Sequence, residues 1–246
     1  MSRPYDWDAV LASWRDTPGS SLLRAYSDEA NRRLLAAWLP GRSRRVLKTD
    51  VFDEAVARGL SPFLAARAGS LVAVDASPAA VAAARRRYPE LEAHVADVRA
   101  LPFEDASFDA VVSNSTLDHF PAGGDVEAAV RELHRVLEPG GLLVLTLDNP
   151  WHPLVALRNA LPFRLLARIG LVPYYVGVTC GPRGLRRVLG EAGFVVERVT
   201  AVLHVPRVAA RALRPPLRLL LEGERLERWP SRFLTGQFVA ARARRP

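Results

Sequence analysis

Residues 101–120 read LPFEDASFDAVVSNSTLDHF and contain the clearest strand signal in the chain. Its apolar run at 110–113 is typical of a buried strand. Polar side chains follow at 114–119, where a parallel strand would reach its carboxyl end. Open α/β sheets bind their ligands at that edge. The stretch therefore predicts a strand whose carboxyl end carries functional groups.

Short apolar runs alternate with helical segments on both sides of this stretch. Such alternation predicts a parallel sheet with crossover helices. The expected strands are 46–48, 71–74, 93–95, 110–113 and 142–147, with helices at 62–67, 78–88 and 126–137. Further on, the pattern predicts a helix at 183–192, a strand at 194–205, an Arg-rich amphipathic helix at 208–226 broken at Pro215 and Pro216, and a closing strand at 237–242.

The length of 246 residues is consistent with a single domain, 1–246. Residues 1–40 are expected to form a helical lid and 45–150 the core of the sheet. The apolar, proline-punctuated stretch 151–180 is expected to be a substrate cap inserted after the fifth strand. Residues 181–246 then supply the last helices and strands.

The composition argues against several classes of protein. Cys180 is the single cysteine and the five histidines are scattered, so neither a disulfide nor a metal site is predicted. The net charge of +8 comes almost entirely from arginines spread along helices without interleaved aromatic residues, which makes nucleic-acid binding an unfavoured function. No signal peptide or membrane-spanning run is recognisable, so a cytoplasmic protein is expected.

The Arg-rich helix at 208–226 has three interpretations. It is compatible with contact to a membrane surface, with contact to a partner protein, and with a solvated face over a core stripe. Nothing in the sequence indicates an oligomeric state.

Two acids follow predicted strands. Asp75 ends the run LVAVD beside the helix start formed by Ser77 and Pro78, where a carboxylate can accept both hydroxyl protons of a ribose or merely cap the helix. Asp97 can accept a hydrogen bond from an adenine amino group while Val98 donates its backbone N–H to a ring nitrogen. The alternative for Asp97 is a turn residue.

Residues 45–150 resemble the class I S-adenosylmethionine-dependent methyltransferases, most closely the small-molecule branch that includes quinone C-methyltransferases. The resemblance is carried by 101–120 together with VDASPAAV at 74–81 and LEPGGLLVL at 137–145. It implies an α/β, Rossmann-like seven-stranded sheet with an antiparallel last strand. It also implies the cofactor S-adenosyl-L-methionine and methyl transfer to a small, partly hydrophobic acceptor.

The resemblance assigns site residues one by one. Asp75 and its neighbour Ala76 are expected at the ribose, Asp97 and Val98 at the adenine, and Asn114 near the methionyl group.

The first cofactor loop departs from the family pattern. Family members follow the first strand with an acid and a glycine-rich loop, so that backbone amides approach the cofactor without a Cβ in the way. This chain has KTDVFDE at 48–54 and no glycine until Gly59. The long interval before the helix that Ser61 and Pro62 begin leaves room for a short turn within the loop.

Lys48 takes the place of the usual acid and is the only lysine in the chain. It is expected either to pair with Asp50, Asp53 or Glu54, or to have a role that needs a compact ammonium. An unpaired ammonium about 4 Å from the cofactor's positive charge would cost about 4 kcal/mol at an effective dielectric of about 20.

Two functional hypotheses follow from this loop. In the first, the protein binds S-adenosylmethionine and Asp50 or Asp53 takes the amino group of the cofactor. In the second, it is a non-methylating descendant with a binding or scaffold role or a different reaction.

Methyl transfer needs a base only when the acceptor is a hydroxyl or a carbon acid. His119, after the fourth strand, and His152, in the cap, are the candidate bases. Packing at the rim is the alternative for His119, and a solvated loop position is the alternative for His152. Tyr174, Tyr175 and Thr179 are candidates for orienting a substrate.

Overall fold

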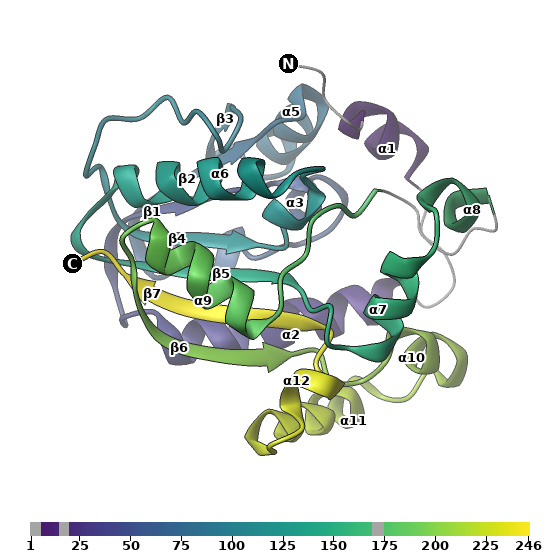
Figure 1. The fold of residues 1–246 in the computed structure, drawn as a ribbon. Helices are drawn as coiled ribbons and strands as arrows, with labels where there is room; N and C mark the ends of the chain where they lie inside the picture. The colour runs from purple at the N-terminus through teal and green to yellow at the C-terminus, as the bar shows by residue number, and fades with distance from the viewer. Residues whose placement is uncertain (1–5, 15–19, 169–174) are drawn as a thin grey trace.

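The computed structural model describes residues 6–14, 20–168 and 175–246, apart from the side chains of Arg164 and Ala167. Parts of the predicted lid and cap, including Tyr174, therefore lie outside the described residues. Seven strands form one sheet in the order β3-β2-β1-β4-β5-β7-β6 (Figure 1). They are β1 (Ser43–Lys48), β2 (Ala68–Asp75), β3 (Glu92–Val95), β4 (Phe108–Asn114), β5 (Leu137–Asp148), β6 (Val195–Val202) and β7 (Phe238–Arg244).

The first five strands pair in parallel, and β7 runs antiparallel between β5 and β6. The predicted Rossmann-like sheet with an antiparallel last strand is confirmed.

The described helices are α1 (Trp7–Ser13), α2 (Ser20–Trp38), α3 (Phe52–Val56), α4 (Ser61–Ala65), α5 (Pro78–Arg87), η1 (Leu117–His119), α6 (Gly123–Val136), α7 (Pro153–Ala160), α8 (Phe163–Arg168), α9 (Pro182–Glu191), α10 (Arg207–Leu213), α11 (Leu217–Glu222), η2 (Gly223–Arg228) and α12 (Arg232–Thr235).

The helical predictions differ from the structure in detail. The expected turn within the first loop is α3, and the helix predicted at 62–67 is the short α4. The helix predicted at 208–226 is divided into α10, α11 and η2, with Pro215 and Pro216 at the first break. No helix in the described part of the chain is both long enough and apolar enough to cross a membrane.

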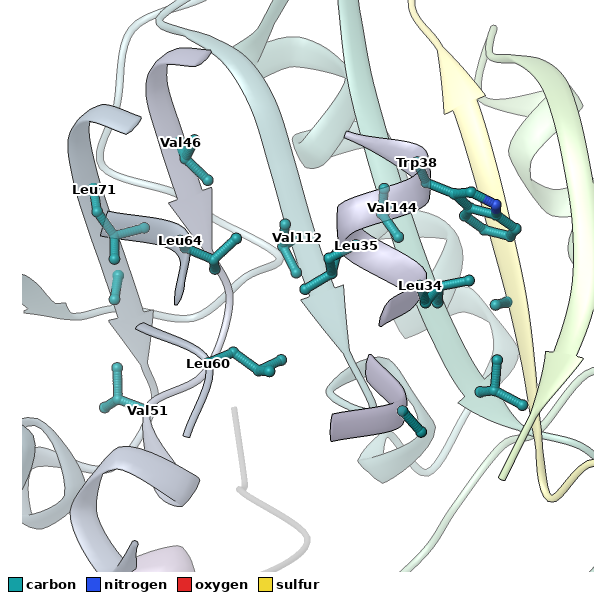
Figure 2. Packing of buried hydrophobic residues seen from close by; sticks show 14 of the residues in the cluster. Leu34, Leu35, Trp38, Val46, Val51, Leu60, Leu64, Leu71, Val112 and Val144 are labelled. Carbon is teal, nitrogen blue, oxygen red and sulfur yellow. The ribbon is translucent and has the colours of Figure 1, made fainter. Parts of the chain in front are cut away.

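Helices cover both faces of the sheet, so the central strands are buried on both sides. This explains why their sequences read as continuous apolar runs. On one face, Leu34, Leu35 and Trp38 of α2 lie over Val112 and Val144 of β4 and β5 (Figure 2). Burying a side chain of this size contributes about 1.5–3 kcal/mol. The other face is covered by α6 and α9.

Tyr26 joins α2 to the C-terminal helices. Its hydroxyl donates to the Glu224 carboxylate and accepts from the Val205 nitrogen at 3.2 Å. The same carboxylate accepts from the backbone nitrogens of Leu203 and His204, each at 3.0 Å. Burial, reinforced by the charge of Glu224, raises the pKa of Tyr26 above its usual range, so the hydroxyl keeps its proton.

Replacing Tyr26 with Phe should lower the free energy of unfolding by about 1–3 kcal/mol, because the Val205 N–H loses its acceptor and Glu224 loses a donor. Urea denaturation measures this change. Tyr88→Phe is the control, since the Tyr88 hydroxyl donates to the Arg58 carbonyl at an exposed position. An equal loss in both variants would contradict the assigned role of Tyr26.

Candidate functional site

The carboxyl ends of four parallel strands bring polar groups to one edge of the sheet. Lys48 ends β1, Asp75 ends β2, Asn114 ends β4 and Asp148 ends β5. We call this the carboxyl edge. It unites predicted site residues that lie far apart in the sequence.

Lys48 is buried and paired. Its Nζ donates to the Asp50 carbonyl, and it lies 3.2 Å from Asp50 Oδ1 and 3.0 Å from Glu54 Oε2. Burial alone would lower the pKa of Lys48, but the charges of Asp50 and Glu54 outweigh it and hold the pKa above its usual range. Of the two expectations for Lys48, the structure therefore contains the ion pair.

Glu54 organises the rest of the loop from a fully buried position. Its Oε1 accepts hydrogen bonds from the Leu60 nitrogen at 2.9 Å, the Ser61 nitrogen at 2.9 Å and the Ser61 hydroxyl at 2.8 Å. A Cβ on Gly59, whose φ is +62°, would lie 2.4 Å from Glu54 Cδ. The first glycine of the loop thus makes room for a buried carboxylate.

The two remaining acids of the loop differ in their partners. Asp50 pairs with Lys48 and accepts from the Thr116 hydroxyl at 3.4 Å. Asp53 is half-buried, and its backbone carbonyl accepts from the Ala57 nitrogen at 2.7 Å, but no hydrogen bond or ion pair of its carboxylate is found within the described residues. Burial, together with the negative charges of Asp50 and Glu54, raises the pKa of Asp53 to about 7. Asp53 therefore retains the capacity to bind an added cation.

Asp75 ties the loop to β2. Its Oδ2 accepts from the Val51 nitrogen at 2.9 Å and its Oδ1 from the Ser77 nitrogen at 2.8 Å. Ser77, not Asp75, caps α5, because its hydroxyl accepts from the Ala80 nitrogen at 2.9 Å. Burial raises the pKa of Asp75 to about 6. Each oxygen accepts one backbone bond and keeps a lone pair for a further donor. Ala76 lies half-buried beside it.

Helix α1 lies across this part of the carboxyl edge. Asp8 accepts hydrogen bonds from the Ser77 hydroxyl and, at 3.3 Å, from the Ala79 nitrogen. The ring of Trp7 makes edge contacts with His119 at 4.7 Å and with Phe52 at 5.9 Å between centroids. An N-terminal segment thereby covers the ends of β1, β2 and β4.

Asp97 and Val98 lie in the turn after β3. Arg99 holds the Asp97 carboxylate at 2.6 Å and also pairs with Asp125 at 2.6 Å. Asp97 remains 40% exposed, so it can still accept from solvent or a ligand. No hydrogen bond from the Val98 N–H is found within the described residues. This N–H is thus a donor that a ring nitrogen could use.

The ends of β4 and β5 form a second polar network. Asn114 accepts from the Thr146 hydroxyl at 2.9 Å. Asp118 is buried and accepts from the Ser115 hydroxyl and the Asp148 nitrogen, each at 3.0 Å. Arg158 of α7 pairs with Asp148 at 2.7 Å. Burial, together with the charge of Asp118, raises the pKa of Asp148.

The two candidate bases have different surroundings. His119 Nδ1 lies 3.0 Å from the Tyr175 carbonyl, and its Nε2 lies 3.7 Å from Asp118 Oδ1. His152 is 95% buried, whereas a solvated loop position was its alternative. Burial, together with the nearby His204, lowers the pKa of His152. His119 belongs to the carboxyl-edge network, whereas His152 is buried at the residue that precedes α7.

Sequence reasoning missed three acids of this region. Asp148 directly follows a predicted strand, and Asp118 precedes a candidate base, so both carried a signal. Asp8 carried no such signal in the sequence, because its contact with Ser77 depends on how α1 packs.

Within the ranges that the structure describes, no group of three or more His, Cys, Asp or Glu side chains could hold a metal ion.

Comparison with known proteins agrees with this geometry. The methyltransferase domain family model matches residues 52–145. A probable S-adenosylmethionine-dependent methyltransferase of Mycobacterium tuberculosis is 30% identical over 165 residues, covering 67% of this chain and 55% of the relative. A demethylmenaquinone methyltransferase of Thermus thermophilus is 36% identical over 129 residues, covering 50% of this chain and 54% of the relative. The chain thus spans about half the length of these curated relatives.

The fold has solved counterparts as well. The N-methyltransferase NodS from Bradyrhizobium japonicum, solved with S-adenosyl-l-homocysteine, superposes with a TM-score of 0.57 at 16% identity, covering 97% of this chain and 95% of NodS. Residues 52–145 thus match the methyltransferase domain family, and the chain shares its fold with solved S-adenosylmethionine-dependent methyltransferases.

Proposed function

We propose that this protein transfers a methyl group from S-adenosylmethionine to a small, partly hydrophobic acceptor. The observation that carries the proposal is Asp75, at the end of β2, with a lone pair left on each carboxylate oxygen beside the altered loop. In this superfamily fold, that position suits the two hydroxyl groups of a ribose.

The charges of the altered loop fit a cationic cofactor. Lys48 is matched by Asp50 and Glu54, which removes the repulsion expected of an unpaired ammonium. Asp53 adds a third carboxylate close by, so residues 48–54 carry three negative charges against one positive charge when all are ionised. A negative field favours a ligand that carries a sulfonium and an ammonium. We assign the ammonium to Asp53, because Asp50 is already paired with Lys48.

The adenine end has suitable groups too. Asp97 would accept from the exocyclic amine, and the Val98 N–H, for which the described part of the chain provides no acceptor, would donate to a ring nitrogen. Leu101 is buried next to this turn and offers an apolar surface for the ring. When bound, the cofactor supplies the methyl group for an in-line displacement. The protein contributes alignment and, with α1 over the edge, exclusion of water.

His119 is the base that the geometry favours for a hydroxyl or carbon-acid acceptor. When Nδ1–H donates to the Tyr175 carbonyl, Nε2 is left as the proton acceptor. The Asp118 carboxylate, 3.7 Å from Nε2, would stabilise the imidazolium that forms. His152 has the weaker case because it is buried.

The acceptor is expected to have an apolar body. The segment after β5 is rich in leucine and carries Trp151 beside α7, which suits a hydrophobic molecule at the end of the sheet. The quinone chemistry named for the Thermus relative fits such a molecule.

Isothermal titration should detect saturable binding of S-adenosylmethionine and of S-adenosylhomocysteine. Asp75→Asn should weaken both by roughly tenfold to hundredfold, as expected for lost hydrogen bonds to a charged group of about 1.5–3 kcal/mol. Asp105→Asn, in the turn before β4, is the matched control. Absence of binding by the wild-type protein would refute the proposal. Binding without methyl transfer to any acceptor tested would favour the non-methylating alternative.

Affinity for S-adenosylmethionine should rise as the pH increases through about 7, the pKa of Asp53. Below that value Asp53 is protonated and neutral, so its attraction for the cofactor ammonium is lost. One pH unit below the pKa, the affinity should have dropped by up to about tenfold. Asp53→Asn should bind more weakly and lose this step, keeping only the dependence near 6 where Asp75 titrates. An unchanged pH profile in Asp53→Asn would exclude the assignment.

Lys48→Met should lower the free energy of unfolding by about 3–5 kcal/mol, because it leaves the buried Glu54 carboxylate without its cation. Adding Glu54→Gln should recover part of that loss, which a double-mutant cycle in urea would measure. If Lys48→Met keeps wild-type stability but loses activity, Lys48 has a chemical role and the structural assignment is wrong.

A further inference from the structure

Exposed apolar side chains gather on two helical segments. Among the described residues, twelve large hydrophobic side chains are exposed, and ten of them lie in 151–165 or 208–234. These ranges contain α7 and part of α8, and α10 to α12, respectively. Exposed apolar side chains that gather on a few elements mark candidate interaction sites, whereas singly scattered ones are normal on a protein surface.

The same two segments lack acidic residues over long stretches. No Asp or Glu occurs in 149–190, and none occurs in 207–221. The second stretch carries four arginines, Arg207, Arg211, Arg214 and Arg218, within fifteen residues. Residues 207–234 as a whole carry seven arginines against the three acids Glu222, Glu224 and Glu227, so the surface combines exposed hydrocarbon with a net positive charge.

Helix α10 illustrates how the fold presents this combination. Its Ala210 is buried in the cluster that includes residues of α2. At 100° per residue, Val208 lies on the opposite face, with Arg211 beside it. Val208 is 66% exposed and Leu213, at the end of the helix, is 78% exposed.

Helix α11 repeats the arrangement. Leu220 is buried in the same cluster, while Leu219 is 55% exposed and Arg218 is exposed next to it. Trp229, which follows η2, is 59% exposed. Aromatic rings of this kind are enriched where proteins meet the headgroup region of a bilayer.

Both segments come from the same edge of the molecule. Helix α7 follows β5 and α10 follows β6, and these two strands run in the same direction on either side of β7. Figure 1 shows α7, α8 and α10 on the side where these strands end. We call residues 151–168 and 207–234 the basic apolar face.

We propose that the basic apolar face docks on an anionic phospholipid bilayer. Arginines attract the negative headgroups, and the exposed leucine, valine and tryptophan side chains enter the boundary between headgroups and acyl chains. A bilayer satisfies both kinds of side chain, whereas a nucleic acid would leave the apolar ones in water. This inference does not depend on methyl transfer, and lipid binding tests it directly.

Vesicle flotation of the full chain should recover the wild-type protein with phosphatidylglycerol vesicles but not with phosphatidylcholine vesicles. Arg211→Glu/Arg218→Glu should weaken binding by at least about thirtyfold, since each arginine near an anionic surface contributes about fivefold. Leu213→Ser/Leu219→Ser should weaken it by about tenfold or more. All four side chains are exposed, so both variants should keep the wild-type melting temperature.

The matched control is Arg86→Glu/Arg131→Glu, which makes the same charge change at exposed positions on α5 and α6. It should float like the wild type. Three results would overturn the proposal: no flotation of the wild type, equal loss in the control, or wild-type flotation of the Leu213→Ser/Leu219→Ser variant. Preferential retention on DNA or on an acidic polypeptide would also overturn it, because charge alone would then explain the face.

Discussion

The buried carboxylate of Glu54 is the constraint on which the first loop depends. A charged side chain that is buried away from water is stabilised only when an opposite charge and several hydrogen bonds surround it. Lys48 supplies the charge, and Leu60 and Ser61 supply the donors at the start of α4. The buried Glu54 carboxylate also explains why residue 59 is a glycine, since a Cβ at this position would collide with the carboxylate. The loop is therefore held together by its own side chains.

This arrangement changes how the carboxyl edge meets a cofactor. In the usual pattern, glycines let backbone amides approach the ligand. Here the Val51 N–H is directed to Asp75, and the charges of Asp50 and Asp53 lie beside it. In the proposed binding mode, recognition depends more on carboxylate charge and less on backbone donors. Since Asp53 and Asp75 have raised pKa values, that mode links ligand affinity to pH.

The end of the molecule at which the parallel strands finish carries two opposite electrostatic environments, the acidic carboxyl edge and the basic apolar face. Within the carboxyl edge, Asp50, Asp53 and Asp75 make the surroundings acidic. Outside it, the segments after β5 and β6 are free of acids over long stretches and rich in arginine and leucine. A cationic cofactor suits the first environment, and an anionic surface suits the second. The sheet separates them by placing strand ends inside and their following helices outside.

The strands and the sheet were predictable from the amino-acid sequence, because apolar runs and helical periodicity report local backbone structure and burial. The sequence also located Asp75, Asp97 and Asn114 after strands, since strand ends are visible in the pattern. Three features became visible only in the folded chain: Lys48 pairs with Asp50 and Glu54, the Asp53 carboxylate has no such partner among the described residues, and His152 is buried. These outcomes depend on side chains that packing brings together, and periodicity does not record such contacts.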